Sequence, residues 1–236
     1  MKVDFYFSYR SPYSYFILPR IKKLIEEYNV EVNFKLVYPL AIREPSFFRT
    51  KNMFTYFFWR LLDYRRVANK LGMSFYRPRP DPISQNLFTG KISSEQPYIF
   101  YVCHLGQAAH YHGQGINFAY ALSNNIFGSK EGWYEKNSLS KVCNLVGLNL
   151  EDLEKEATDQ EKKIVSDIEL NQKQQLAAGH HGVPLLVHRD KYFFGQDRFD
   201  DFFAFMIENG MQKRGSSLPT KKASNTYLML SPVLKI

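Results

Sequence analysis

The sequence predicts an α/β fold that carries a large all-helical insertion. Strand-like segments occur only near the two ends of the chain, at residues 2–8, 30–38, 183–188 and 191–195. Between them, residues 46–178 show helical spacing of apolar side chains and little strand pattern. A length of 236 residues fits one large domain or a domain with a big insertion. We therefore expect both ends of the chain to contribute to a single sheet.

The first forty residues predict a βαβ unit. Residues 2–8, KVDFYFS, are rich in aromatic and β-branched side chains that favour a strand. Ser11 is a good helix N-cap, and Pro12 fits the first helical turn, where its missing N–H costs nothing. Apolar residues then recur at helical spacing through residues 15–28, and residues 30–38 are typical of a second strand.

The middle of the chain predicts a block of helices rather than a second sheet. The first helix of the block ends at Gly72, which suits a left-handed C-terminal position, and Asn149 is a good cap for the last one. The expected helices span residues 52–71, 95–112, 114–127, 135–146 and 150–178.

A β-hairpin and one helix are expected near the C-terminus. Residues 183–188 and 191–195 flank a tight turn, and a helix follows over residues 197–209. The polar, basic segment after Gly210 is expected to be loosely ordered. This order of elements predicts a thioredoxin-like fold with a helical insertion. The expected parts are a thioredoxin-like domain at 1–45 and 179–212, a helical domain at 46–178 and a basic tail at 213–236.

Composition and charge limit the classes of function. The net charge is +8, but the basic residues are dispersed and no nucleic-acid-binding fingerprint is present, so we expect no nucleic-acid partner and a preference for small anions. No apolar run approaches the roughly 18 residues that a membrane span needs, and no signal peptide is evident, so a cytoplasmic protein is expected. Cys103 and Cys143 are expected to be buried thiols, and the histidines form no metal-ligand pattern.

Ser11 is the first candidate catalytic residue. A Cys-x-x-Cys pair at such a strand-to-helix junction would mark a redox protein, but here the outer positions are Ser11 and Ser14. Disulfide exchange is therefore excluded at this site. A helix N-terminus stabilises an anion, and a hydroxyl can add a hydrogen bond, so Ser11 could activate a thiolate supplied by a ligand. The competing interpretation is that Ser11 only caps the helix.

Two further segments lie where a ligand could bind. In thioredoxin-like folds, the proline before the hairpin often follows a cis peptide bond, as Pro184 would in Gly-Val-Pro at 182–184. Val183 could then offer its backbone N–H and C=O to an extended peptide. In FGQDR at 194–198, Asp197 could bind an ammonium and Arg198 a carboxylate, both of which a γ-glutamyl group carries. An ordinary loop proline and a surface ion pair are the alternatives.

These segments together resemble a known family. The strand followed by SPYSY, the GVP at 182–184 and the FGQDR at 194–198 are similar to 2-hydroxychromene-2-carboxylate isomerases and the related kappa-class glutathione transferases. The segment from Asp63 to Gly72 resembles the long-helix pattern of that family, and residues 133–153, which end in VGLNLEDL, resemble its later helices. The resemblance runs over most of the chain.

The resemblance implies a glutathione site and a homodimer. In the isomerases, the glutathione thiolate adds reversibly to a conjugated 2-oxo acid, which lets a carbon–carbon bond rotate. The residues implied to bind glutathione are Ser11 at the sulfur, Val183 and Pro184 at the cysteinyl backbone, and Gln196, Asp197 and Arg198 at the γ-glutamyl end.

A second substrate with a carboxylate would need a cation. Arg43 stands where the isomerases have Lys, and Arg49, Lys51 and Asn52 are further candidate polar contacts, although Trp59 replaces a common Tyr. We therefore expect a glutathione-dependent isomerase acting on an aromatic or conjugated carboxylate. A kappa-like transferase or peroxidase and a non-catalytic binding module remain the alternatives.

Overall fold

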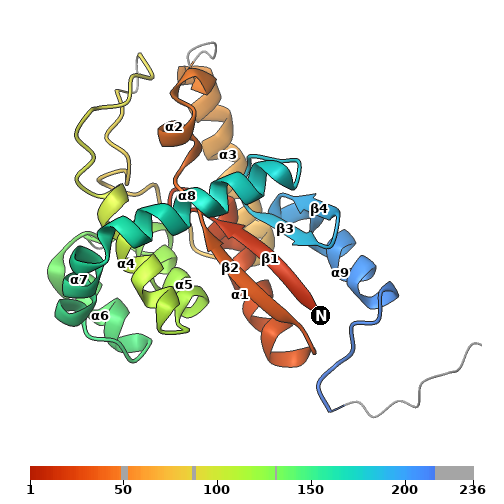
Figure 1. The fold of residues 1–236 in the computed structure, drawn as a ribbon. Helices are drawn as coiled ribbons and strands as arrows, with labels where there is room; N and C mark the ends of the chain where they lie inside the picture. The colour runs from red at the N-terminus through yellow and green to blue at the C-terminus, as the bar shows by residue number, and fades with distance from the viewer. Residues whose placement is uncertain (49–52, 87–88, 131, 216–236) are drawn as a thin grey trace, which may run out of the picture.

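Both ends of the chain contribute to one four-stranded sheet. The computed structural model describes residues 1–48, 53–86, 89–130 and 132–215. The strands are β1 (Lys2–Phe7), β2 (Glu31–Leu36), β3 (Leu185–His188) and β4 (Lys191–Phe194), in the spatial order β2-β1-β3-β4. β1 pairs parallel with β2 and antiparallel with β3, and β3 pairs antiparallel with β4 (Figure 1). The predicted thioredoxin-like fold with a helical insertion is confirmed.

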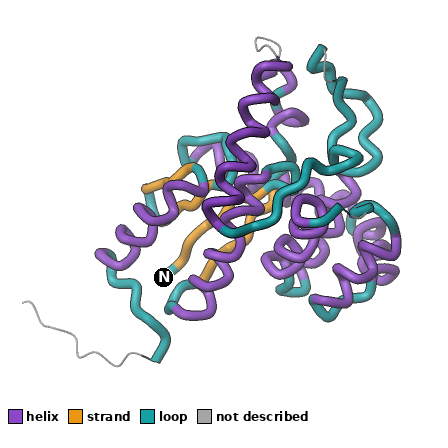
Figure 2. Tube along the Cα trace, turned by 180° about the vertical axis from the view of Figure 1, so that it is seen from behind, coloured by secondary structure: helices purple, strands orange, loops and turns teal. Residues whose placement is uncertain are grey.

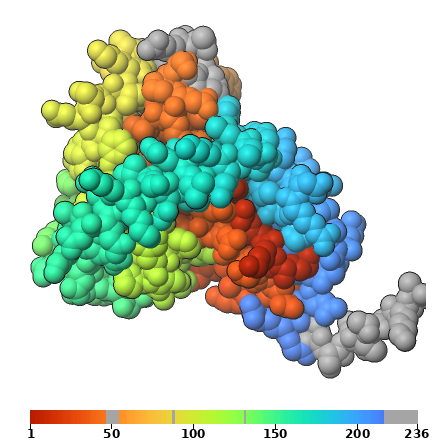
Figure 3. All heavy atoms as spheres, viewed as in Figure 1, coloured from red at the N-terminus to blue at the C-terminus, as the bar shows by residue number. Residues whose placement is uncertain are grey.

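Alternation along β1 separates the two faces of the sheet. Val3, Phe5 and Phe7 are fully buried in the main core, which also contains the apolar side of α1 (Pro12–Glu27). Tyr6 belongs to a small second cluster on the other face. Seen from behind, α1 and α9 (Phe199–Glu208) cover the main-core side (Figure 2), whereas α8 (Glu161–Ala177) crosses the opposite side from the insertion to the hairpin (Figure 3).

The insertion is helical, as predicted, but two of its boundaries differ. Its first helix, α3 (Met53–Leu71), ends at Gly72 with φ +65°, and Asn149 accepts hydrogen bonds from the N–H groups of residues 151 and 152. The prediction of one helix over 150–178 was wrong. The chain turns at Gln160, because this turn lets both resulting helices pack against α4. The other helices are α4 (Ile99–Tyr111), α5 (Gly115–Gly128), α6 (Lys136–Leu145) and α7 (Leu150–Asp159).

The helix predicted at 95–112 starts four residues later than expected. Gln96 lies in the preceding loop, where its side chain accepts the N–H of Ser84 and donates to the carbonyl of Ser84. A short helix, α2 (Leu40–Arg43), and a 3-10 turn, Pro45–Phe48, were not predicted. Four residues are too few to show helical periodicity, so a helix of this length leaves no pattern in the sequence.

The C-terminal elements fit the sequence with two corrections. The hairpin and the cis Val183–Pro184 peptide bond are confirmed, but the last helix is preceded by a 3-10 turn at Gln196–Arg198. The segment after Gly210 was expected to be loosely ordered. Instead Met211 is buried and Arg214 donates its backbone N–H to the carbonyl of residue 27, so this segment is fixed against the end of α1. Residues 216–236 of the expected tail lie outside the described residues.

Two further expectations concern the cysteines and membrane-spanning helices. Cys103 and Cys143 are both free and buried, as expected. None of the helices in the described part of the chain is long and apolar enough to cross a bilayer.

Candidate functional site

A cavity of about 700 Å³ opens at the N-terminus of α1. Its walls come from the end of β1, the short helix α2, the α3 helix, the loop after α3, and the loop before β3. Small-molecule pockets usually measure ~300–1,000 Å³, so this cavity can hold a ligand of drug-like size. The predicted site residues Ser11, Arg43 and Val183 all line it.

Ser11 both caps the helix and lines the cavity. Its Oγ accepts the backbone N–H of Ser14 at 3.1 Å, and its own backbone N–H donates to the carbonyl of Ser8. Pro12 has no N–H, so the N–H of Tyr13 is the first-turn donor with no partner among the described residues. Because the Ser11 Oγ uses only a lone pair in the cap, its O–H can still donate to an anion in the cavity.

The loop that contains the cis peptide bond forms another part of the cavity wall. Val183 borders the cavity, whereas Pro184 is buried behind it and its carbonyl accepts the N–H of Gly195 at 2.9 Å. No hydrogen bond to the backbone N–H or C=O of Val183 is present among the described residues, so both groups can pair with an extended ligand.

The three predicted γ-glutamyl contacts do not line the cavity. Gln196, Asp197 and Arg198 form the 3-10 turn that contacts α1. Arg198 pairs with Asp201 one turn later, and Asp197 is exposed. The structure therefore brings Ser11 and Val183 together around one cavity and leaves these three residues beside it.

Arg43 is held by the protein itself. Its Nε donates to the carbonyl of Tyr38 at 2.7 Å, its Nη1 to Oε1 of Gln175 at 3.2 Å, and its Nη2 to the carbonyl of His181 at 2.9 Å. Gln175 is fully buried and its Nε2 also donates to the carbonyl of Gly182. Arg43 thus ties α2 to the loop before the cis proline, a role that the sequence did not indicate.

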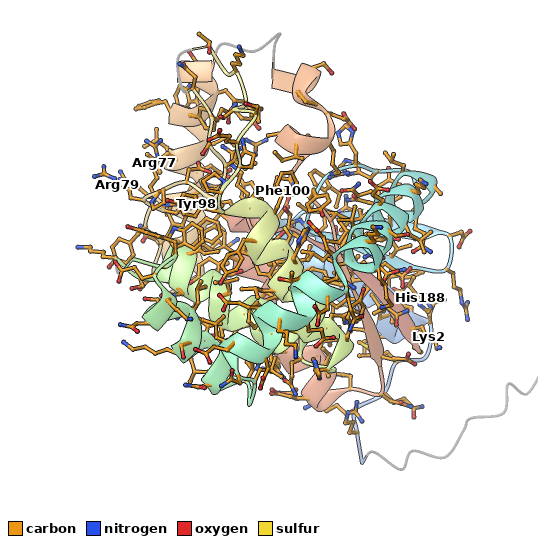
Figure 4. All side chains as sticks on the ribbon, turned by 60° about the vertical axis from the view of Figure 1, so that its left-hand side comes forward. Lys2, Arg77, Arg79, Tyr98, Phe100 and His188 are labelled. Carbon is orange, nitrogen blue, oxygen red and sulfur yellow. The ribbon has the colours of Figure 1, made fainter. Side chains whose placement is uncertain are left out.

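Three other arginines reach the cavity, and the sequence analysis assigned none of them. Arg10 pairs with Asp81 at 3.0 Å and donates to Gln85, which fixes the loop after α3. Arg60 lies on α3, and Arg77 lies beside Arg79 on the loop, at the edge of the molecule (Figure 4). With Arg43 they make four arginines, against one carboxylate, Asp81, in the described cavity wall, so the cavity favours anions.

Tyr13 connects the helix start to α3. Its phenol O–H donates to Asp63, and Nη1 of Arg60 donates to its oxygen at 3.2 Å. Burial, followed by the hydrogen bond to Asp63, raises the pKa of Tyr13 to about 12. Tyr13 therefore stays a neutral phenol at physiological pH. Its place in Ser-Pro-Tyr-Ser was the only sequence signal for this role.

His180 is fixed as a neutral imidazole. Its Nδ1 accepts the backbone N–H of Gly182 at 2.9 Å, and its ring stacks on Phe194 at 3.9 Å. Burial lowers its pKa, and the neighbouring His181 lowers it further. Its Nε2 therefore carries the proton and can donate a hydrogen bond.

The remaining predicted contacts cannot be placed. Arg49, Lys51 and Asn52 lie outside the described residues. Among the described residues, no group of three or more His, Cys, Asp or Glu side chains could hold a metal ion.

The fold and this cavity define a class of protein. It is a thioredoxin-like fold with a helical insertion, in which serine rather than cysteine begins the helix at the site. No known protein family and no curated protein matches the sequence. Solved structures, however, share the fold over most of the chain.

Three solved structures illustrate the likeness. A 2-hydroxychromene-2-carboxylate isomerase has a TM-score of 0.66 at 16% identity, covering 89% of this chain and 96% of its own. A probable DsbA oxidoreductase from Streptomyces coelicolor has 0.61 at 14% identity, covering 88% and 89%. The cytosolic disulfide reductase DsbM from Pseudomonas aeruginosa, solved with GSH, has 0.56 at 13% identity, covering 89% and 98%. At these identities the likeness shows the fold, and that fold is used by both isomerases and oxidoreductases.

Proposed function

We propose that this protein is a glutathione-dependent isomerase that acts on an aromatic or conjugated 2-oxo acid. The observation that carries the proposal is Ser11, which caps α1 and lines a cavity of about 700 Å³ whose wall also includes Val183 of the cis Val183–Pro184 bond. The chain has no cysteine at this helix start, so the reactive sulfur must come from a ligand.

Glutathione fits the chemistry of the cavity. Its thiolate would accept hydrogen bonds from the Ser11 O–H and the Tyr13 N–H at the positive end of the helix, which lowers the pKa of a bound thiol. Its cysteinyl backbone would pair with Val183, beside Pro184. To reach Gln196, Asp197 and Arg198, its γ-glutamyl end would have to extend beyond the cavity wall, which does not include these three residues.

The reaction needs no net redox change. The thiolate adds to the conjugated double bond of the 2-oxo acid, forming a carbon–sulfur bond and an enolate. The former double bond is then single and can rotate. Expulsion of the thiolate restores the double bond in the other geometry and regenerates glutathione. The excess of arginines around the cavity would stabilise the substrate carboxylate and the enolate.

One observation favours a transferase instead. Arg43, the expected carboxylate contact, donates three hydrogen bonds to other residues of the protein. The cavity walls also include four aromatic residues, Phe57, Phe58, Phe75 and Phe127. Such walls also suit an uncharged aromatic electrophile. A kappa-like transferase would consume one glutathione per turnover, whereas an isomerase would not, so thiol consumption separates the two.

The first test is glutathione binding by calorimetry and thermal shift. A ligand at 100 times its dissociation constant adds about 2.7 kcal/mol to stability, which is roughly 5–10 °C for a chain of this size. We expect this shift and a thiolate ultraviolet absorbance near neutral pH, and we expect Ser11→Ala to lose the absorbance.

The matched control is Asn149→Ala, which removes the cap of α7 and costs about 1 kcal/mol. It should lower stability without changing the thiolate signal. Absence of binding at millimolar glutathione would contradict both the isomerase and the transferase, leaving a non-catalytic binding module.

A further inference from the structure

A second, smaller cavity lies behind one wall of the first. It measures about 320 Å³, and its described lining is Tyr13, Thr55, Tyr56, Trp59, Arg60 and Asp63. Tyr13, Tyr56 and Arg60 also line the larger cavity, so these three side chains form a shared wall. We call the smaller one the outer cavity. Its volume is at the low end of the ~300–1,000 Å³ typical of small-molecule pockets, which suits a ligand with one aromatic ring.

Arg60 lines the outer cavity and has hydrogen-bond donors without a partner among the described residues. Its guanidinium lies 5.3 Å from the ring centre of Tyr56 and 5.7 Å from that of Tyr13. Its hydrogen bond to described residues is the one from Nη1 to the Tyr13 oxygen, at 3.2 Å. A guanidinium has five N–H donors in a planar fork that matches a carboxylate. Arg60 is half-buried and makes no ion pair with a described carboxylate.

Asp63 lines the same cavity but forms its ion pair with Arg66, not with Arg60. One of its oxygens accepts the Tyr13 O–H, and the other accepts two donors of Arg66, at 2.8 and 3.1 Å. Asp63 is therefore balanced by Arg66, and Tyr13 stays neutral because its proton is held against Asp63. Arg60 therefore makes no direct ion pair with a described carboxylate of this wall, and its charge acts on Asp63 less strongly than the hydrogen bonds from Tyr13 and Arg66 do.

Trp59 provides an apolar face beside this charge. Its side chain is 64% exposed, which is unusual for a residue that can bury so much apolar area. Its ring meets Phe58 edge-on, with centroids 5.8 Å apart and an interplanar angle of 76°. No described aromatic ring stacks on the indole face, so a flat ligand ring can lie against it.

We propose that the outer cavity binds a flat aromatic carboxylate, with the carboxylate on the guanidinium of Arg60 and the ring against Trp59. This site adjoins the glutathione cavity across the shared wall, and binding at it does not require glutathione. Because Arg60 and Tyr13 belong to both cavities, a ligand there contacts the wall of the proposed catalytic site.

The test uses benzoate as the probe and benzamide as its neutral counterpart. Calorimetry gives the affinity, and tryptophan emission gives the location. The chain has two tryptophans, and Trp133 is 1% exposed, donates its Nε1 to the carbonyl of Pro80 and lines neither described cavity. We expect benzoate, but not benzamide, to change the emission saturably, and Trp59→Phe to remove that change.

Arg60 is tested with a matched control on the same helix. Arg60→Gln should weaken benzoate binding by about tenfold or more, the worth of a charged hydrogen bond. The benzoate affinity of Arg60→Lys should lie between those of the wild type and Arg60→Gln, because lysine keeps the charge but loses the planar, two-pronged set of N–H donors. Arg65→Gln removes an exposed arginine that lines neither cavity and should bind benzoate as the wild type does.

Three results would overturn the outer site. They are benzoate binding unchanged in Arg60→Gln, equal binding of benzamide, and loss of the Trp59 signal when glutathione saturates the protein. The last would show that benzoate occupies the larger cavity. A failure of glutathione to bind would refute the proposed function and leave the benzoate result standing.

Discussion

Replacing Arg43 with methionine separates a structural role from a substrate contact. The structure gives this side chain three hydrogen bonds, to the carbonyls of Tyr38 and His181 and to Oε1 of Gln175. Arg43→Met keeps much of the apolar stem and removes every donor. The three acceptors would then lose their partner, and the loop before the cis proline would lose its tie to α2.

The loss in the free energy of unfolding of Arg43→Met follows from these three hydrogen bonds. A hydrogen bond from a charged donor is worth about 1.5–3 kcal/mol. Of the three acceptor residues, only His181 lines the cavity, where water can replace the lost hydrogen bond, whereas Gln175 is fully buried. We expect a total loss of about 3 kcal/mol, taking the three bonds together and below their simple sum. For a chain of this size, that lowers Tm by about 6–12 °C.

Thermal and urea unfolding of Arg43→Met and Arg65→Met measure this loss. Arg65 is exposed on α3, so its replacement should stay within about 0.5 kcal/mol of wild type. If Arg43→Met unfolds within about 2 °C of wild type, the three bonds contribute little. Arg43 would then be better explained as a ligand contact, and the assignment of a structural tie would be wrong.

Two further predictions concern stability. Burial lowers the pKa values of His104, His110 and His180 below the unfolded value. Their contribution to the stability of the folded state is therefore present above about pH 6.5 and is lost as the pH falls from there through the lowered pKa values. Tm should therefore fall between pH 7 and 5, and His104→Phe should flatten that fall; an unchanged slope would exclude His104 as a contributor. A Cβ at Gly106 would lie 2.3 Å from the Tyr9 hydroxyl oxygen. Gly106→Ala should therefore lower Tm by several degrees, and an unchanged Tm would show that Tyr9 can move aside.

Much of the fold followed from local sequence patterns. Alternating and helical periodicities predicted the four strands and most helices, and Ser11, Gly72 and Asn149 marked helix ends correctly. Each of these signals acts within one turn or one strand, so it is present in the sequence itself. The chain turn at Gln160 was missed because it depends on how two helices pack against α4, not on a local breaker.

The site was predicted only in part, and for a related reason. Ser11 and the cis Val183–Pro184 bond were identified because each belongs to a short motif with a defined backbone geometry. Arg43 was expected at a carboxylate, yet its donors meet Gln175 and His181, which are more than 130 positions away in the sequence.

The sequence by itself therefore determined the class of fold, the absence of a cysteine pair at the helix start, and the position of the anion-favouring hydroxyl of Ser11. Only the tertiary structure decided which cations remain available to a ligand. An arginine is available or engaged according to the acceptors that packing places within hydrogen-bond reach, and these acceptors come from distant segments. Packing surrounded Arg43 with such acceptors, whereas Arg60 lines a cavity and donates one hydrogen bond to the described residues, to Tyr13.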